Sequence, residues 1–304
     1  MDTNTESPVP PDNTAGPAPP CPQIVRMAPL WDGGRALLAF LLLALVSLLL
    51  GLLFVDLLGF YWSVALSELL AFGALPYLIS RWFDTGWSRW MKRARVAAAF
   101  WGWAVVAVVS FAVVESNLPV LFDRIWPIPP SQFEVYRRYL AASSPGELLL
   151  LLVVAALIPG IFEEITFRGL IQSGLKRSFG ARPAIVWSGF LFALLHLNPW
   201  NFVGLWVFGC LLGYLVERTG SIWPAVFVHI INNSIALVVF ASQSPAEWEH
   251  PLEVLPWYLT GASGFVLILA LWRLHQIPIR GADEPASAEA ESISRGQPFD
   301  EWRG

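Results

Sequence analysis

The sequence predicts an all-α protein: a polytopic bundle of about eight membrane-spanning helices with disordered termini. Three observations support this prediction. Hydrophobic residues make up 56% of the 304 residues and charged residues only 14%, whereas soluble domains carry about 25% charged residues. The chain contains 16 Trp, a residue that gathers at membrane interfaces. Apolar stretches of roughly 20 residues recur along the chain, which is the length that a helix needs to cross a bilayer.

The first half of the chain is predicted to hold a tail and three spans. Residues 1–29 are rich in Pro, Thr, Asn and Asp without an apolar period, which is typical of a disordered tail. The tail is not expected to be a signal peptide, because no basic segment precedes the late apolar run. Residues 30–142 are predicted to contain three spans: Ala36–Val55, Tyr61–Ser80 and Val96–Val114. Pro76 is expected to kink the second span. A basic, Trp-rich segment from Arg81 to Arg95 is predicted to lie at the membrane interface, and a proline-rich connection follows the third span.

Residues 143–242 are predicted to form the membrane core. Ser143 or Ser144, followed by Glu147, is typical of a helix start, and Pro159 is expected to bend the helix that follows. Residues 243–280 contain an acidic loop and the last span, and residues 281–304 are again predicted to be a disordered tail. The five spans predicted in this half are Pro145–Phe179, Pro183–Leu197, Phe202–Val216, Ile222–Ala241 and Leu255–Leu274.

The charge distribution predicts the orientation of the protein in the membrane and argues against nucleic-acid binding. Eight spans place both termini on one side, and most Lys and Arg residues fall on that side. By the positive-inside rule, both termini are therefore expected to be cytoplasmic. Nucleic-acid binding is not indicated, because basic residues are few and form no long run. The two cysteines, Cys21 and Cys210, offer neither a disulfide nor a cysteine metal framework.

Three charged residues interrupt the apolar helix at residues 145–179. Each of Glu163, Glu164 and Arg168 costs roughly 2.5–3.5 kcal/mol at the centre of a membrane helix, so pairing or function must offset the cost. Glu164 and Arg168 are four residues apart with the glutamate first, which favours an ion pair. Glu163 lies about 100° around the helix and is left without that partner. An unpaired carboxylate in a dry site takes up a proton or finds a polar partner, which makes Glu163 the candidate general base.

Two later spans offer polar partners. His196 lies near the end of the span at 183–197, while His229 and Asn233 are four residues apart on one face of the span at 222–241. A carboxylate and a histidine can activate a water, and a histidine beside an asparagine can donate to an oxyanion. At ~1.5 Å per residue, Glu163 and His196 lie ~20 Å from the cytoplasmic ends, Asn233 ~18 Å and His229 only ~12 Å. Tilt of the helices or a different helix start would explain why His229 is counted at a smaller depth than the other three residues.

These motifs resemble those of the CPBP (CAAX protease and bacteriocin-processing) family, which includes the type II CAAX prenyl endopeptidases. The resemblance covers about residues 143–242 and rests on Glu163-Glu164-x-x-x-Arg168, Phe192-x-x-x-His196 and His229-x-x-x-Asn233 in that order. It implies an α-helical intramembrane peptidase in which Glu163 and His196 activate water and His229 and Asn233 form the oxyanion hole. Glu164 and Arg168 would organise the site.

The same resemblance implies cofactors, partners and location. A metal-free glutamate peptidase is expected, because the His229 and Asn233 pair suits an oxyanion better than a metal. The alternative is a zinc site made of nitrogen and carboxylate ligands, namely Glu163, Glu164, His196 and His229. The expected substrate is a peptide or a membrane protein, lipidated or not, cleaved near the cytoplasmic leaflet of what we expect to be a bacterial inner membrane.

Two other functions stay open at this point. The first is a non-catalytic bacteriocin-immunity or membrane scaffold protein, since some members of the family are associated with self-immunity. The second is a proton-coupled transporter, which also uses buried Glu and His but predicts inverted repeats that the sequence does not display. The Glu164 and Arg168 pair could also be purely structural, even within an enzyme.

Overall fold

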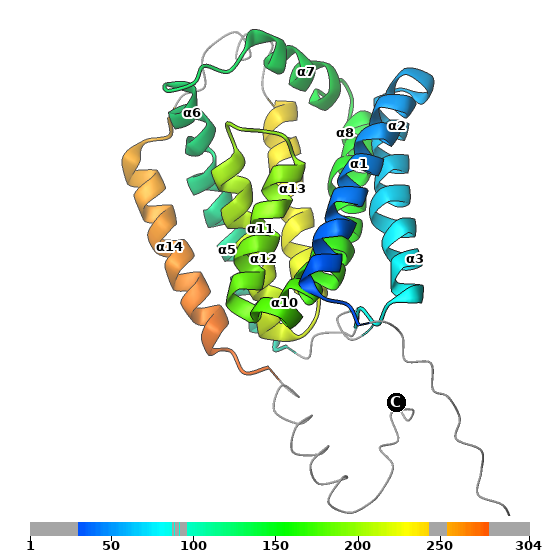
Figure 1. Cartoon of the computed structure of the whole chain (residues 1–304). Coiled ribbons are helices and arrows are strands. Elements are labelled where there is room, and N and C mark those ends of the chain that lie inside the picture. The colour runs from blue at the N-terminus through cyan, green and yellow to red at the C-terminus, as the bar shows by residue number, and fades with distance from the viewer. Residues whose placement is uncertain (1–29, 87, 89–90, 92–95, 243–253, 280–304) are drawn as a thin grey trace, which may run out of the picture.

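The computed structural model describes residues 30–86, 88, 91, 96–242 and 254–279, in which helices run side by side as a bundle (Figure 1). Both ends of the described chain lie at the same end of the bundle: Leu30 pairs with Asp84, and Ile279 pairs with Val96. The tails predicted at 1–29 and 281–304 lie outside the described residues. So do the acidic loop at 243–253 and most of the basic segment between 87 and 95.

The predicted membrane bundle is confirmed for the described residues. Seven helices are long and apolar enough to cross a membrane, and the remaining predicted span is a shorter apolar helix, Ala181–Leu195. The ends of these helices lie within three residues of the predicted ranges, except that the third span continues to Asp123, nine residues beyond its predicted end at Val114. They are Gly33–Leu58, Phe60–Trp82, Ala98–Asp123, Pro145–Phe179, Phe202–Thr219, Trp223–Ser242 and Trp257–Gln276.

Two of these spans are divided into several helical elements by π-helical turns. The elements are α1 (Gly33–Leu58), α2 (Phe60–Ser67), the π-helix η1 (Glu68–Ala74), α3 (Leu75–Trp82), α5 (Ala98–Glu115), α6 (Asn117–Asp123), α7 (Pro130–Leu140), α8 (Pro145–Leu152), the π-helix η2 (Val153–Leu157), α9 (Ile158–Glu164), the π-helix η3 (Ile165–Gln172), α10 (Ser173–Phe179), α11 (Ala181–Leu195), α12 (Phe202–Thr219), α13 (Trp223–Ser242) and α14 (Trp257–Gln276).

Two of the π-helices end two residues before a proline. Pro76 follows η1 and Pro159 follows η2. A proline has no N–H, and its ring clashes with the carbonyl four residues earlier, so that carbonyl loses its usual donor. Side chains from other segments supply replacements. Thr166 Oγ1 donates to the carbonyl of Phe72 at 2.9 Å, and Asn233 Nδ2 donates to the carbonyl of Ala155 at 3.4 Å.

The start of α8 confirms the predicted capping residues. Ser144 is the N-cap, and its hydroxyl accepts from the backbone N–H of Glu147 at 3.2 Å. The Glu147 carboxylate reaches back and accepts from the N–H of Ser143 at 2.7 Å. These two bonds form a capping box, which sets where the helix that carries the three charged residues begins.

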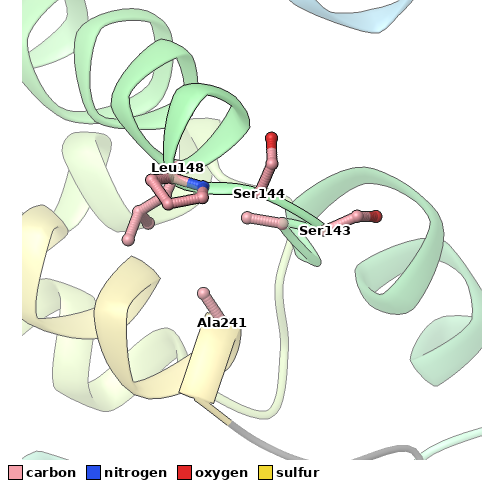
Figure 2. Close-up of a pocket in the computed structure, with 6 residues that line it drawn as sticks. Ser143, Ser144, Leu148 and Ala241 are labelled. Carbon is pink, nitrogen blue, oxygen red and sulfur yellow. The ribbon is translucent and has the colours of Figure 1, made fainter.

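A cavity of about 300 Å³ lies beside this helix start and the end of α13. Figure 2 shows that Leu148 and Ala241 face one another across it, whereas the hydroxyls of Ser143 and Ser144 point away. The Ser144 hydroxyl is already used in the cap. The cavity therefore presents mainly apolar groups, and we place the chemistry of the protein elsewhere.

Candidate active site

The predicted ion pair between Glu164 and Arg168 is confirmed. Arg168 Nη1 lies 3.1 Å from Glu164 Oε1, and both side chains are fully buried. Arg168 Nη2 also donates to the carbonyl of Gly209 on α12 at 2.9 Å, and its guanidinium lies 5.0 Å from the ring centroid of Phe192. Because a buried charge without partners is costly, these contacts explain how an arginine is accommodated inside the bundle.

Two glycines bring the Gly209 carbonyl within reach of Arg168. A Cβ added to Gly209 would lie 2.7 Å from Cα of Gly189 on α11, and one added to Gly189 would lie 2.8 Å from the backbone nitrogen of Cys210. Such distances are far below ordinary contact, so only glycine allows α11 and α12 to pack this closely. The close packing places a backbone acceptor beside the guanidinium.

His229 connects the two glutamates. Its Nδ1 atom lies 2.9 Å from Glu164 Oε1, and its Nε2 atom lies 3.8 Å from Glu163 Oε2. Since an ionised carboxylate only accepts hydrogen bonds, Nδ1 is the donor to Glu164. The ring is buried, with 1% of the residue exposed, and the α13 backbone approaches α9 at Gly160, where a Cβ would lie 2.6 Å from Cγ1 of Ile230.

Glu163 is the carboxylate that lacks a hydrogen-bond partner. It forms no hydrogen bond with any described residue, and its Oε2 atom is buried and unsatisfied. The side chain keeps 9% of its surface accessible, enough to contact a small molecule. Glu164, by contrast, binds both Arg168 and His229 through one oxygen. The two adjacent acids thus have separate environments, as their positions on the helix predict.

His196 lies at the C-terminal end of α11 and is exposed at the protein surface. Its Nδ1 atom lies 2.8 Å from the carbonyl oxygen of Phe192. A carbonyl can only accept, so Nδ1 carries the hydrogen, and Nε2 of the neutral ring is a free acceptor. This is the tautomer that a general base requires.

Phe192 is the residue around which these groups gather. Its ring centroid lies 4.6 Å from that of His196 and 5.6 Å from that of His229. In the described part of the chain, no direct hydrogen bond joins His196 to Glu163. The structure therefore brings Glu163, Glu164, Arg168 and His229 together directly, and His196 through the aromatic ring between them.

Asn233 is one turn beyond His229 on α13 but makes a different contact. Its amide donates to the carbonyl of Ala155, the acceptor that Pro159 leaves without a backbone donor. At 3.4 Å this hydrogen bond is long. Asn233 thus has a structural contact that the sequence analysis did not anticipate, beside the oxyanion role that we predict for it.

The depth of His229 differs from the count along the sequence, which placed it about 8 Å nearer the cytoplasmic end than Glu163. One contribution comes from η3, which covers Ile165–Gln172 between Glu163 and Lys176. A π-helix has more residues per turn than an α-helix, so the chain rises less per residue. Glu163 consequently lies nearer to His229 than an α-helical count indicates.

The side chains do not fit the alternative zinc site. Among the described residues, no group of three or more His, Cys, Asp and Glu side chains has an arrangement that could hold a metal ion. Glu164 Oε1 already binds both the guanidinium and His229 Nδ1. A dication at this oxygen would lie beside a buried positive charge, which is electrostatically unfavourable.

Comparison with known proteins identifies a related family. Residues 145–235 match the family model described as "Type II CAAX prenyl endopeptidase Rce1-like". This segment includes all six predicted site residues. The resemblance to the CPBP family is confirmed. With its apolar helices, the chain is an integral membrane protein carrying a core similar to those of the CPBP peptidases.

A curated relative matches a stretch of similar length. The protein named "Putative membrane peptidase YdiL" from Bacillus subtilis (strain 168) is 26% identical over 90 residues, which are 30% of this chain and 37% of that protein. The chain thus aligns with little more than a third of the length of this relative. No solved structure matches the chain.

Sequence reasoning missed one acid. Glu68 is the first residue of η1, and its Oε2 atom is buried without a hydrogen-bond partner. An acid inside an apolar span is a signal that the sequence offers, but nothing in the sequence says which helix it faces. The roles of Gly160 and Gly209 were also missed, because a close helix contact depends on the three-dimensional packing.

Proposed function

We propose that the protein is an intramembrane endopeptidase that hydrolyses peptide bonds near the cytoplasmic leaflet, in the manner of the CAAX proteases. One observation carries the proposal. Glu163 is a buried carboxylate without a hydrogen-bond partner, and it lies beside His229, which Glu164 and Arg168 hold in place. A purely structural acid would be paired, whereas a general base needs a free acceptor.

In the proposed reaction, Glu163 accepts a proton from water while the water oxygen bonds to the carbonyl carbon of the substrate. Glu163 Oε2 and His229 Nε2 are 3.8 Å apart, so the carboxylate that takes the proton and the ring that donates to the oxyanion lie beside the same small space. His196, with its free Nε2, is the second group that orients the water. When the C–N bond breaks, the proton passes from Glu163 to the leaving amine.

The oxyanion formed in this step needs donors. We assign them to His229 Nε2 and Asn233 Nδ2, as the family resemblance implies. In this role the His229 ring carries both protons, one donated to Glu164 and the other to the substrate oxygen. Glu164 and Arg168 then act by holding His229, and their charges cancel within the buried site. Donors fixed in advance are the most effective form of such stabilisation.

The proposed substrate is a peptide or membrane protein, prenylated or not, in a bacterial inner membrane. Both termini are proposed to be cytoplasmic, and reporter fusions at residues 1 and 304 would test this. The main test of function uses purified protein in detergent with peptide libraries that end in a farnesylated or an unmodified cysteine motif. Cleavage by the natural sequence, and its loss in Glu163→Gln and His196→Ala, is the expected result.

Glu134→Gln is the matched control. Glu134 is exposed, and its ion pair within the described part of the chain is with Arg137 at 2.8 Å. The same change of acid to amide there should leave cleavage unchanged. Equal cleavage by Glu163→Gln and the natural sequence would contradict the peptidase assignment. The immunity or scaffold alternative would then be favoured if cells expressing Glu163→Gln kept resistance to a bacteriocin.

A further inference from the structure

Glu68 is the buried acid that the proposed reaction does not use. It begins η1, in the turn that widens before Pro76, and its Oε2 atom has no hydrogen-bond partner among the described residues. Glu163 Oε2 is unsatisfied in the same way. Glu164 Oε2 is also unsatisfied, but the other oxygen of Glu164 binds Arg168 and His229. Glu68 and Glu163 have no hydrogen bond of this kind among the described residues, which is unusual because buried polar atoms almost always find partners.

The packing places the two acids at the same level. The spans that contain them run in the same direction: α2 and α8 lie at one end of the bundle, and α3 and α10 at the other (Figure 1). They touch where Thr166 bonds the Phe72 carbonyl and where a Cβ on Gly73 would lie 2.9 Å from Phe162. Glu68, about one turn before these contacts, is therefore level with α9. η1 packs directly against α9, so the buried carboxylates of Glu68 and Glu163 lie on two elements that touch.

The charges around this pair do not balance if both acids are ionised. Arg168 lies against Glu164 at 3.1 Å, and the first basic residue after Glu68 in its own span is Arg81, about 20 Å further along the helix. His229 is the remaining titratable group facing Glu163. Two neighbouring carboxylates in an apolar site hold one proton between them, because like charges at close range cannot both persist.

We propose that Glu68 is a positioning residue of the hydrolytic site, which shares one proton with Glu163 and so fixes the orientation of the Glu163 carboxylate. The proton resides on Glu68, whose O–H donates to Glu163, and both unsatisfied oxygens gain a partner. An ionised carboxylate has about four acceptor positions, so Glu163 still accepts from the attacking water. This inference rests on the proposed peptidase function.

The first test does not depend on activity. Infrared spectra of the full-length natural protein and of Glu68→Gln are compared at pH 7. The expected difference is the C=O stretching band of one protonated carboxylic acid, present in the natural protein and absent from the variant. Glu163→Gln should shift this band, because the acceptor changes from a carboxylate to an amide. Loss of a carboxylate band instead, or an unshifted band in Glu163→Gln, would overturn the proposal.

The second test compares two replacements of Glu68 on any peptide that the natural protein cleaves. Glu68→Gln keeps an N–H donor toward Glu163, so kcat should stay within about threefold of the natural value. Glu68→Leu removes the donor, and kcat should fall about 10- to 100-fold, the scale expected for a misplaced catalytic group, with KM nearly unchanged. A folded Glu68→Leu protein with unchanged kcat would contradict the proposal.

The two proposals fail in different ways. If the protein is no peptidase, Glu163→Gln leaves cleavage unchanged, but the infrared comparison still tests the shared proton. If it is a peptidase and Glu68 has no part in the site, Glu163→Gln abolishes cleavage while Glu68→Leu does not. Size-exclusion profiles and unfolding curves of both variants, with Glu134→Gln as the exposed control, show whether each protein is folded.

Discussion

Gly160 and Ile230 hold α9 and α13 at a separation that no other residue at position 160 would allow. A Cβ at Gly160 would lie 2.6 Å from Cγ1 of Ile230 and 3.3 Å from its backbone nitrogen. Ile230 directly follows His229, whose ring lies between Glu163 and Glu164. The absence of one side chain on α9 is therefore what lets the imidazole on α13 reach both carboxylates.

Gly160→Ala tests this dependence. The added methyl should push α9 from α13, lengthen the contact between His229 and Glu164, and lower kcat by up to about 100-fold. The overpacking should also cost about 1–3 kcal/mol of stability. Peptide cleavage and unfolding in mixed detergent micelles measure the two effects. Gly264→Ala is the control, because a Cβ there meets nothing within 4 Å; an equal loss in both variants would contradict the argument.

Arg168→Met tests the buried ion pair. The variant leaves Glu164 ionised without its guanidinium and the Gly209 carbonyl without that donor, so it should lose about 3–5 kcal/mol of stability. Adding Glu164→Gln removes the second charge and should recover part of the loss. Thermal unfolding of the single and double variants provides the measurement. If the double variant is less stable than Arg168→Met alone, the lost ion pair is not the main cause of the loss of stability.

Asn233→Ala separates the two roles of this residue. As an oxyanion donor, Asn233 should contribute about 10²- to 10³-fold to kcat. As the donor to the Ala155 carbonyl, it should contribute about 1 kcal/mol to stability. The adjacent Ser234→Ala is the control, because the Ser234 hydroxyl bonds Ile230 within its own helix at 2.7 Å. If Asn233→Ala lowers stability and leaves kcat unchanged, the asparagine is structural only.

Chelators should leave cleavage unchanged. The arrangement of the acids and histidines offers no metal site among the described residues, and Glu164 Oε1 is shared by Arg168 and His229. Elemental analysis of active protein should find far less than one zinc per chain, before and after dialysis against 1,10-phenanthroline. Activity that falls with the chelator and returns with added zinc would establish the zinc alternative.

The sequence was sufficient to predict the parts of the structure that depend on distances along one helix. Hydropathy predicted the spans because each crosses the same thickness of bilayer. The contact between Glu164 and Arg168 followed from their spacing of four residues. Ser144 and Glu147 predicted the start of α8 for the same reason, because a capping box involves only neighbouring residues.

The parts that could not be predicted depend on which faces of two helices meet. The packing of η1, which begins at Glu68, against α9 requires the alignment of two spans about 90 residues apart in sequence. The carbonyls of Phe72 and Ala155 find donors on other segments, and Gly189 and Gly209 touch across two helices. The π-helical η3 was also not anticipated, and it changes the depth at which Glu163 lies.

The shortness of α11 has a consequence for the surrounding lipid. Its 15 residues span about 22 Å, against about 30 Å of hydrocarbon in a typical bilayer. The turn after His196 must then begin below the lipid surface. There the Asn201 side chain donates to Glu115 at 2.7 Å, and its backbone N–H donates to Asn198 Oδ1 at 3.2 Å. Either the bilayer is thinner around this turn or water penetrates to it. Because a thinner bilayer brings water closer to the turn, the proposed hydrolysis should be faster in short-chain lipids than in long-chain ones.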